Sequence, residues 1–269
     1  MQDNRSLFSA DGALRAAGRF WFVVAVSGQL MFVYYILALY GRATVDGNLA
    51  TWGTVMPKGY VVGDGLGNLL LMSHVLLAAV ITLGGAIQLI PQVRMIAPTF
   101  HRWNGRVYVA TAVFMSLGGF YLVWVRGGVG SFVHHLGVSA NGLAILICAA
   151  LALRAAMARR FDSHRRWALR LFLVVSGVWF FRVGLMLWLF VNKGPVGFDP
   201  KTFEGPFLNV LAFAEFLLPL AVLEMYLRAQ DRGGNMRRLV VAGGLTVLTL
   251  AMGVGIGIAT MGMWLPRIR

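Results

Sequence analysis

The chain has 269 residues, 58% of them hydrophobic, and a mean hydropathy of +0.73, which excludes an ordinary soluble domain. Its net charge of +14 first suggests a nucleic-acid partner. The basic residues, however, are distributed as expected for a membrane protein with basic loops on one side, so we expect no nucleic-acid binding. Cys148 is the single cysteine. This excludes a disulfide framework, a cysteine-type zinc site and covalent haem attachment through CxxCH.

Seven apolar stretches follow one another along the chain, each of about the 20 residues needed to cross the hydrocarbon core. They are residues 20–40, 69–91, 107–125, 136–157, 168–192, 206–228 and 239–266. Backbone polar groups in lipid must be bonded within the protein, so these stretches are predicted to be helices. We therefore expect an all-α integral membrane protein with about seven transmembrane helices and contact with the lipid bilayer.

The basic residues alternate between the two sides of the predicted membrane. The N-terminal tail and the even-numbered loops carry 16 Lys and Arg residues, whereas the C-terminal tail and the odd-numbered loops carry 7. This is the positive-inside pattern, which predicts a cytoplasmic N-terminus. It also supports the count of spans, because one missed or invented span would disturb the alternation.

We expect a single transmembrane domain over residues 1–269, in four parts. These are a cytoplasmic tail (1–19), a first span with a long outer loop (20–67), a central four-helix bundle (68–192), and two further spans with the C-terminus (193–269). The loop at 41–67 has two interpretations, as a functional cap or docking segment and as a plain connector with a short helix.

All five histidines lie within the predicted four-helix bundle, each close to the start of a span. Successive spans start on alternate sides, so His74 and the pair His134/His135 share the outer side, and His101 and His164 share the inner side. Imidazole is the usual axial ligand of b-type haem iron, and ligation by two histidines suits electron transfer. We therefore predict two b-type haems. The outer ligands are His74 with either His134 or His135, and the inner ligands are His101 with His164.

Arginines near these histidines are candidates for cofactor binding. Arg102, Arg106 and Arg165 could bind haem propionates, although the positive-inside pattern also explains them. Arg182 lies within the fifth span, at the same predicted depth as Glu215 in the sixth, about 15 Å from the outer ends. Charged groups in a span usually face the bundle interior. Arg182 is thus interpreted either as a ligand for a propionate or quinone-like headgroup, or as the ion-pair partner of Glu215.

Two segments of the chain are similar to each other. His101-Arg102 is followed by Trp103 and Arg106, and His164-Arg165 by Trp167 and Arg170, so that Trp and Arg are three residues apart in both. Internal duplication and chance both explain this match.

The segment His101-Arg102-Trp103-Asn104-Gly105-Arg106-Val107-Tyr108, with His164-Arg165-Arg166-Trp167, resembles a family of bacterial multi-pass membrane proteins of unknown function. The resemblance covers about residues 69–190, and it implies a multi-pass protein of the bacterial inner membrane. More distantly, the layout resembles the cytochrome b561 superfamily. There, four consecutive helices carry four histidines that bind two haems b, the first helix pairing with the third and the second with the fourth. This chain departs from that pattern in its seven spans and doubled histidine.

The function predicted first is transmembrane electron transfer through the two b-type haems, between a quinol or small reductant and an acceptor on the other side. That would make the chain a membrane-bound oxidoreductase of cytochrome b561 type, as a homodimer or as a subunit of a complex. The first alternative is a haem-free transporter or assembly subunit that uses Arg182 and Glu215. The second alternative is a membrane enzyme with His101 or His164 as acid or base.

Overall fold

The computed structural model describes residues 9–56 and 58–268, which are almost entirely helical. Within these ranges there is no β-strand, only an isolated bridge between Asp199 and Glu204. The elements are α1 (Ala10–Ile36), η1 (Leu37–Gly41), α2 (Arg42–Val45), α3 (Ala50–Val55), α4 (Gly65–Gln88), α5 (Pro91–Ile96), α6 (Pro98–Trp124), α7 (Phe132–Met157), α8 (Phe161–Val175), α9 (Gly177–Val191), α10 (Pro206–Arg232), α11 (Asn235–Ala259), η2 (Thr260–Trp264) and α12 (Leu265–Ile268).

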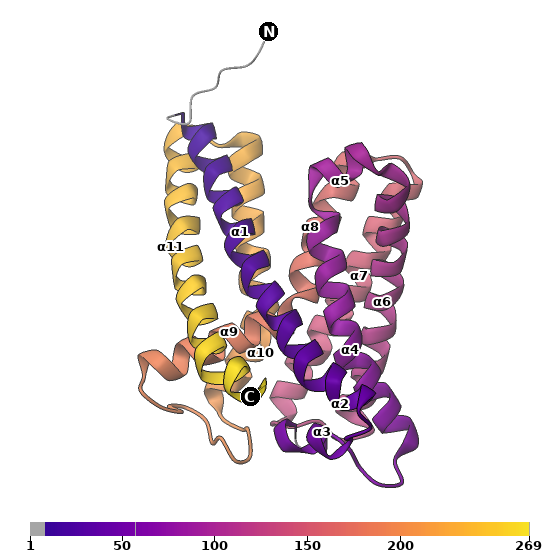
Figure 1. Cartoon of the computed structure of the whole chain (residues 1–269). Helices are drawn as coiled ribbons and strands as arrows, with labels where there is room; N and C mark the ends of the chain where they lie inside the picture. Colours follow the sequence, from indigo (N-terminus) through magenta and orange to yellow (C-terminus); the bar gives the residue numbers. More distant parts are fainter. Residues whose placement is uncertain (1–8, 57, 269) are drawn as a thin grey trace.

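Six helices are long and apolar enough to cross a membrane, and the bent pair α8 and α9 makes a seventh if it is one span. The prediction of an all-α integral membrane protein is therefore confirmed. Figure 1 shows two groups of helices side by side. One contains α4, α6, α7 and α8, which we call the four-helix core, and the other contains α1, α9, α10 and α11. The groups meet where α1 packs on α4 and α10 packs on α7 and α8.

Ion pairs identify the helix ends that lie together. Arg238 at the start of α11 lies 3.1 Å from Asp11 at the start of α1, and Arg166 near the start of α8 lies 2.8 Å from Asp231 at the end of α10. We call this end of the molecule the inner end, and the end that contains α3 the outer end (Figure 1). The helices alternate in direction between the two ends, as the predicted order of spans requires.

The first helix begins earlier than predicted. Ser9 caps α1 by accepting a 3.0 Å hydrogen bond from the backbone N–H of Gly12, the interaction that typically starts a helix. Residues 10–19 of the predicted tail are therefore helical, and residues 1–8 lie outside the described residues. At its other end α1 runs on through η1 and α2 to Val45.

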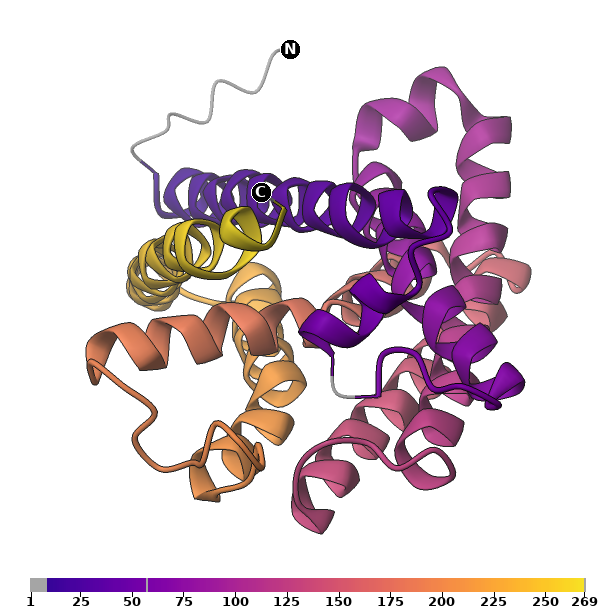
Figure 2. The ribbon, with the colours of Figure 1, turned by 60° about the horizontal axis from the view of Figure 1, so that its bottom comes forward.

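The fifth predicted span is not one straight helix, because α8 and α9 meet at a 51° bend at Ser176. The Ser176 hydroxyl donates to the Phe172 carbonyl four residues earlier, at 2.8 Å, a contact that bends helices. Gln29 of α1 donates to the same hydroxyl at 3.0 Å. As a result α9 leaves the four-helix core and packs on α10 and α11, as the view in Figure 2 shows.

The long outer loop is packed rather than extended, with residue 57 outside the described part. Trp52 of α3 is fully buried and its ring lies 4.7 Å from that of Tyr40. Arg126, just after α6, donates to the carbonyls of Lys58 and Gly67 and to the Asn68 side chain. These contacts attach the loop to the outer ends of α4 and α6.

Candidate functional site

His101 and His164 lie at the inner end of the four-helix core, each as the fourth residue of its helix, α6 and α8. Gln88, the last residue of α4, lies near both. Its Nε2 atom is 3.3 Å from Nε2 of His101 and donates to the His101 carbonyl at 3.1 Å. Gln88 and His164 also line one cavity of about 50 Å³. The structure therefore places both predicted inner histidines near Gln88.

The orientation of His164 suits a metal ligand. Its Nδ1 atom lies 3.0 Å from the Ala152 carbonyl on α7, so we assign the proton to Nδ1. Ligating histidines commonly donate one ring N–H to a backbone carbonyl and coordinate through the other nitrogen. In His101 the contact with Gln88 occupies Nε2, and Nδ1 is buried without a partner.

Three polar residues that the sequence did not single out as site residues complete the inner end. Asn104 donates to the Gly84 carbonyl at 2.9 Å and to the Gln88 side-chain oxygen at 2.8 Å, which fixes the direction of the Gln88 amide. The hydroxyl of Tyr108, which also lines the cavity, is buried without a partner. The signal was available, because Asn104 and Tyr108 lie three and seven residues after His101, on one face of a helix.

The donor atoms at the inner end suit haem iron, but the space does not. A cavity of about 50 Å³ has the size of one or two water molecules, whereas cofactor pockets have roughly 300–1,000 Å³. The side chains of Gln88, Tyr108 and Phe172 fill the region, and a Cβ added at Gly85 would lie 2.9 Å from Tyr108 and 3.0 Å from Phe172. Haem would therefore require Gln88 and its neighbours to move.

The outer histidines have separate surroundings. His74 faces α6, where a Cβ added at Gly119 would lie 3.6 Å from its ring, and its Nδ1 atom is buried without a partner. His134 is buried, with its ring edge-on to Phe181 at 5.6 Å. His135 turns the other way, and its Nε2 atom lies 3.2 Å from the Gly128 carbonyl.

His74 also differs in depth from His134 and His135. Phe120, next to Gly119 on α6, packs on Gly142 of α7. Gly142 is eight residues along α7 from His134, which corresponds to about 12 Å at 1.5 Å per residue. The cause is the early start of α4 at Gly65, which places His74 well inside the helix. The structure therefore does not bring the predicted outer ligands together.

The predicted propionate-binding arginines make other contacts. The Arg106 guanidinium lies 4.7 Å from the Trp103 ring centre, and Arg170 lies 4.6 Å from that of Trp167, so the two similar sequence segments form the same local contact. Arg102 donates to Thr99 at 3.4 Å. Arg165 is exposed.

Arg182 and Glu215 do not form the predicted ion pair. Arg182 donates to the Val178 carbonyl at 3.2 Å and lies 5.3 Å from the centre of the Phe32 ring. Glu215 is 4% exposed and accepts a 3.4 Å hydrogen bond from Asn141. Among the described residues no salt bridge joins the two charges within 4 Å. The bend at Ser176 is the reason, because it turns α9 away from the course that the depth argument assumed.

Glu215 instead belongs to a second polar cluster, which we call the helix-break cluster: Gln29, Asn141, Ser176, Gly177 and Glu215. A Cβ added at Gly177 would lie 2.4 Å from Asn141 Nδ2 and 3.3 Å from Glu215 Oε1, so the cluster is tightly packed. The side-chain oxygens of Gln29 and Asn141 are buried without partners. Neither amide was predicted as a site residue, although each is a polar residue within an apolar span.

The family comparison covers both polar regions. The model of the family DUF2306, described as a predicted membrane protein, matches residues 71–218, more than half of the chain. The chain belongs to this family. The match spans all five histidines, Arg182 and Glu215 of this DUF2306 protein, and it gives no support to the more distant resemblance to cytochrome b561. A search of curated proteins and a search of solved structures gave no match.

Proposed function

We propose that this DUF2306 protein transfers electrons through a b-type haem held by His101 and His164. The supporting observation is that one polar side chain, Gln88, contacts His101 of α6 and lines a cavity together with His164 of α8. His164 donates through Nδ1 and so presents Nε2. A haem held by these two residues would supply one-electron redox chemistry, and the role of His101 and His164 would be to hold its iron.

The proposed setting follows from the charge distribution. The inner end carries most of the basic residues, so the positive-inside rule assigns it to the cytoplasmic face of a bacterial inner membrane. A quinol or other small reductant would deliver electrons, and their transfer to an acceptor on the other side of the membrane would require a second haem nearer that side. A second haem, with His74 and either His134 or His135 as ligands, stays a prediction. It would require α4 and α7 to shift so that these histidines lie at the same depth in the membrane.

Gln88 makes the proposal testable in detail, because its side chain contacts one proposed ligand, His101, and lines a cavity with the other, His164. The protein would be expressed with added haem, and a reduced-minus-oxidised spectrum would give haem per chain. We expect about one b-type haem, lost by at least about tenfold in His164→Ala because one axial ligand is gone. The control, Gly243→Ala, where an added Cβ meets nothing within 4 Å, should keep it, and Gln88→Ala should keep or increase it. Absence of haem in the wild-type protein, or equal haem in all variants, would contradict the proposal.

The helix-break cluster favours a second candidate function, proton-coupled transport without haem. Interrupted helices beside buried ionisable groups form the substrate and coupling-ion sites of many transporters. Glu215 is 4% exposed, with Asn141 as its hydrogen-bond partner, and a carboxylate buried in this way is costly to leave charged. Glu215 would therefore bind and release the coupling proton.

Proteoliposomes containing a trapped pH-sensitive dye would test this candidate under an imposed membrane potential. We expect proton flux in the wild-type protein and its loss in Glu215→Gln. Glu224→Gln is the control, because Glu224 is on the same helix and is half-exposed, paired with Arg170 at 2.6 Å. Flux that is absent in the wild-type protein, or equal in both variants, would argue against proton coupling at Glu215.

A further inference from the structure

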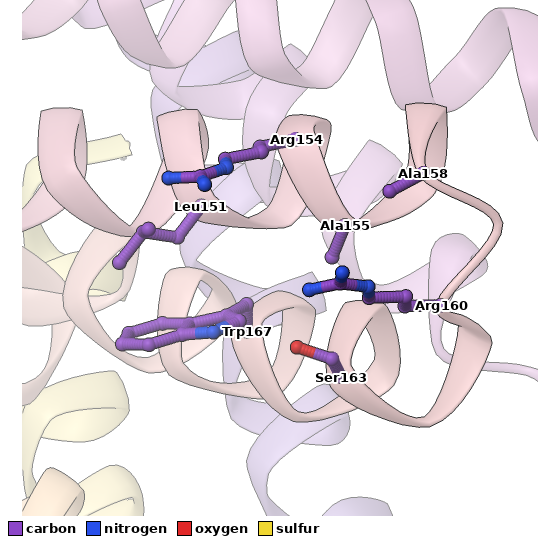
Figure 3. Close-up of a pocket in the computed structure, with 7 residues that line it drawn as sticks. All are labelled: Leu151, Arg154, Ala155, Ala158, Arg160, Ser163 and Trp167. Carbon is purple, nitrogen blue, oxygen red and sulfur yellow. The ribbon is translucent and has the colours of Figure 1, made fainter.

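A separate pocket of about 340 Å³ lies at the inner end, between the end of α7 and the start of α8. Arg154, Arg160 and Ser163 are its polar lining residues, and Leu151, Ala155 and Trp167 contribute apolar surface. Figure 3 shows the guanidinium groups of Arg154 and Arg160 extending in the same direction, toward the side where Leu151 and Trp167 lie.

The backbone turn between the two helices positions this lining. The N–H of Arg159 bonds the Ala156 carbonyl, and the N–H of Arg160 bonds the Ala155 carbonyl, both at 3.0 Å. Arg159 has the left-handed conformation, with φ of 55°. These features define a Schellman motif. The motif ends α7 and places Arg160 directly before α8, on the pocket side.

The two pocket arginines are not neutralised by acidic side chains. Among the described residues neither Arg154 nor Arg160 has an ion pair, whereas Arg166 pairs with Asp231 and Arg170 with Glu224. Guanidinium groups bind phosphate oxygens through charge-assisted, often bidentate hydrogen bonds. Two such groups and the Ser163 hydroxyl line the same pocket, which thus offers hydrogen-bond donors for a phosphate group.

The position of the pocket favours a lipid as the source of that phosphate. It lies at the end of two apolar helices, where headgroups meet the hydrocarbon core, and Trp167 is of the residue type enriched at that boundary. Basic pockets between transmembrane helices on the cytoplasmic side bind anionic headgroups. We propose that Arg154 and Arg160 bind the phosphate of an anionic phospholipid, with an acyl chain along Leu151 and Ala155. This proposal does not depend on the presence of haem.

Native mass spectrometry of the full chain would test it, with phosphatidylglycerol or phosphatidylcholine added at equal concentration. We expect the anionic lipid to be retained preferentially, and its bound fraction to fall by at least about tenfold in Arg154→Gln/Arg160→Gln, since the loss of even one of the charge-assisted hydrogen bonds accounts for that much. The control, Arg228→Gln/Arg232→Gln, removes two exposed charges at the inner end of α10, outside the pocket. This variant should retain the lipid.

Two further measurements keep the proposal open to refutation. If the double variant does not fold, Arg160→Gln alone, an exposed position, should still lower the bound fraction. Inorganic phosphate at the same concentration should not displace the phospholipid. Displacement by phosphate would identify a free-phosphate site, and equal lipid retention in pocket and control variants would identify a general effect of charge. Either result would overturn the proposal.

Discussion

Both ends of the four-helix core are polar, but the polar groups are used differently. At the outer end, Arg126 donates to Lys58, Gly67 and Asn68, and its Nε atom, which has no hydrogen-bond partner, lies 3.2 Å from the Asp64 carboxylate. At the inner end, the Nδ1 atom of His101 and the hydroxyl of Tyr108 are buried without partners near a cavity. The difference is that the Arg126 guanidinium joins loop and helix ends through several hydrogen bonds, which stabilises a structure, whereas the unpartnered groups at the inner end lie near a cavity and need another explanation, such as a ligand or an ordered water.

The largest expected effect is at the outer end. The Arg126 side chain is 7% exposed and Asp64 is 30% exposed, so Arg126→Met should destabilise the protein by about 3 kcal/mol, because it leaves buried acceptors and a charge without a partner. Thermal unfolding in detergent would measure this. Arg42→Met is the control, because its pair with Asp46 is 81% and 55% exposed, and it should cost less than about 1 kcal/mol. Equal effects would mean that the outer contacts are not structural.

The next effect concerns the bend that separates α9 from the core. Gly177→Ala places a Cβ 2.4 Å from Asn141 Nδ2, so it should destabilise by about 2 kcal/mol through overpacking. Gly243→Ala is the matched control within α11, since a Cβ there meets nothing within 4 Å, and it should be neutral or slightly stabilising. Chemical denaturation of both variants would measure the difference. A tolerated Gly177→Ala would mean that the helix-break cluster is loosely packed.

A smaller effect is expected at the inner end. Gln88→Ala removes the contacts to His101 and Asn104 and should cost the haem-free protein about 1 kcal/mol. The same unfolding assay applies. If Gln88→Ala lowered the free energy of unfolding as much as Arg126→Met, the two ends would not differ in this respect. Gln88, His101 and Asn104 would then form a structural network.

The smallest effect is a gain. Arg159 has a φ of 55°, a conformation that glycine adopts without the Cβ penalty, so Arg159→Gly should stabilise by about 0.5–1 kcal/mol. Arg160→Gly, one residue later and outside the left-handed region, should give no such gain. The shift in the unfolding midpoint of each variant would measure this. Equal stabilisation by Arg159→Gly and Arg160→Gly would contradict a turn in which only residue 159 has the left-handed conformation and which positions Arg160.

Some of the candidate site could be predicted from the sequence. His101 and His164 lie near each other because each begins a helix on the same side, a consequence of span order alone. The His74 prediction was less successful, because the Asp64 cap, which accepts a 2.9 Å hydrogen bond from Gly67, starts α4 at Gly65. A histidine near the start of an apolar stretch is therefore not always near the start of a helix.

The sequence by itself determined the helical class, the order of the spans and the alternation of their ends, because a helix in lipid must satisfy its backbone hydrogen bonds locally and needs a continuous apolar stretch. Only the tertiary structure decided which face each helix turns to its neighbours. Ser176 bends the fifth span in contact with Gln29, 147 residues away in the sequence, and Glu215 is bonded to Asn141 rather than paired with Arg182. Such contacts depend on packing between distant segments, which hydropathy and spacing along one helix do not determine.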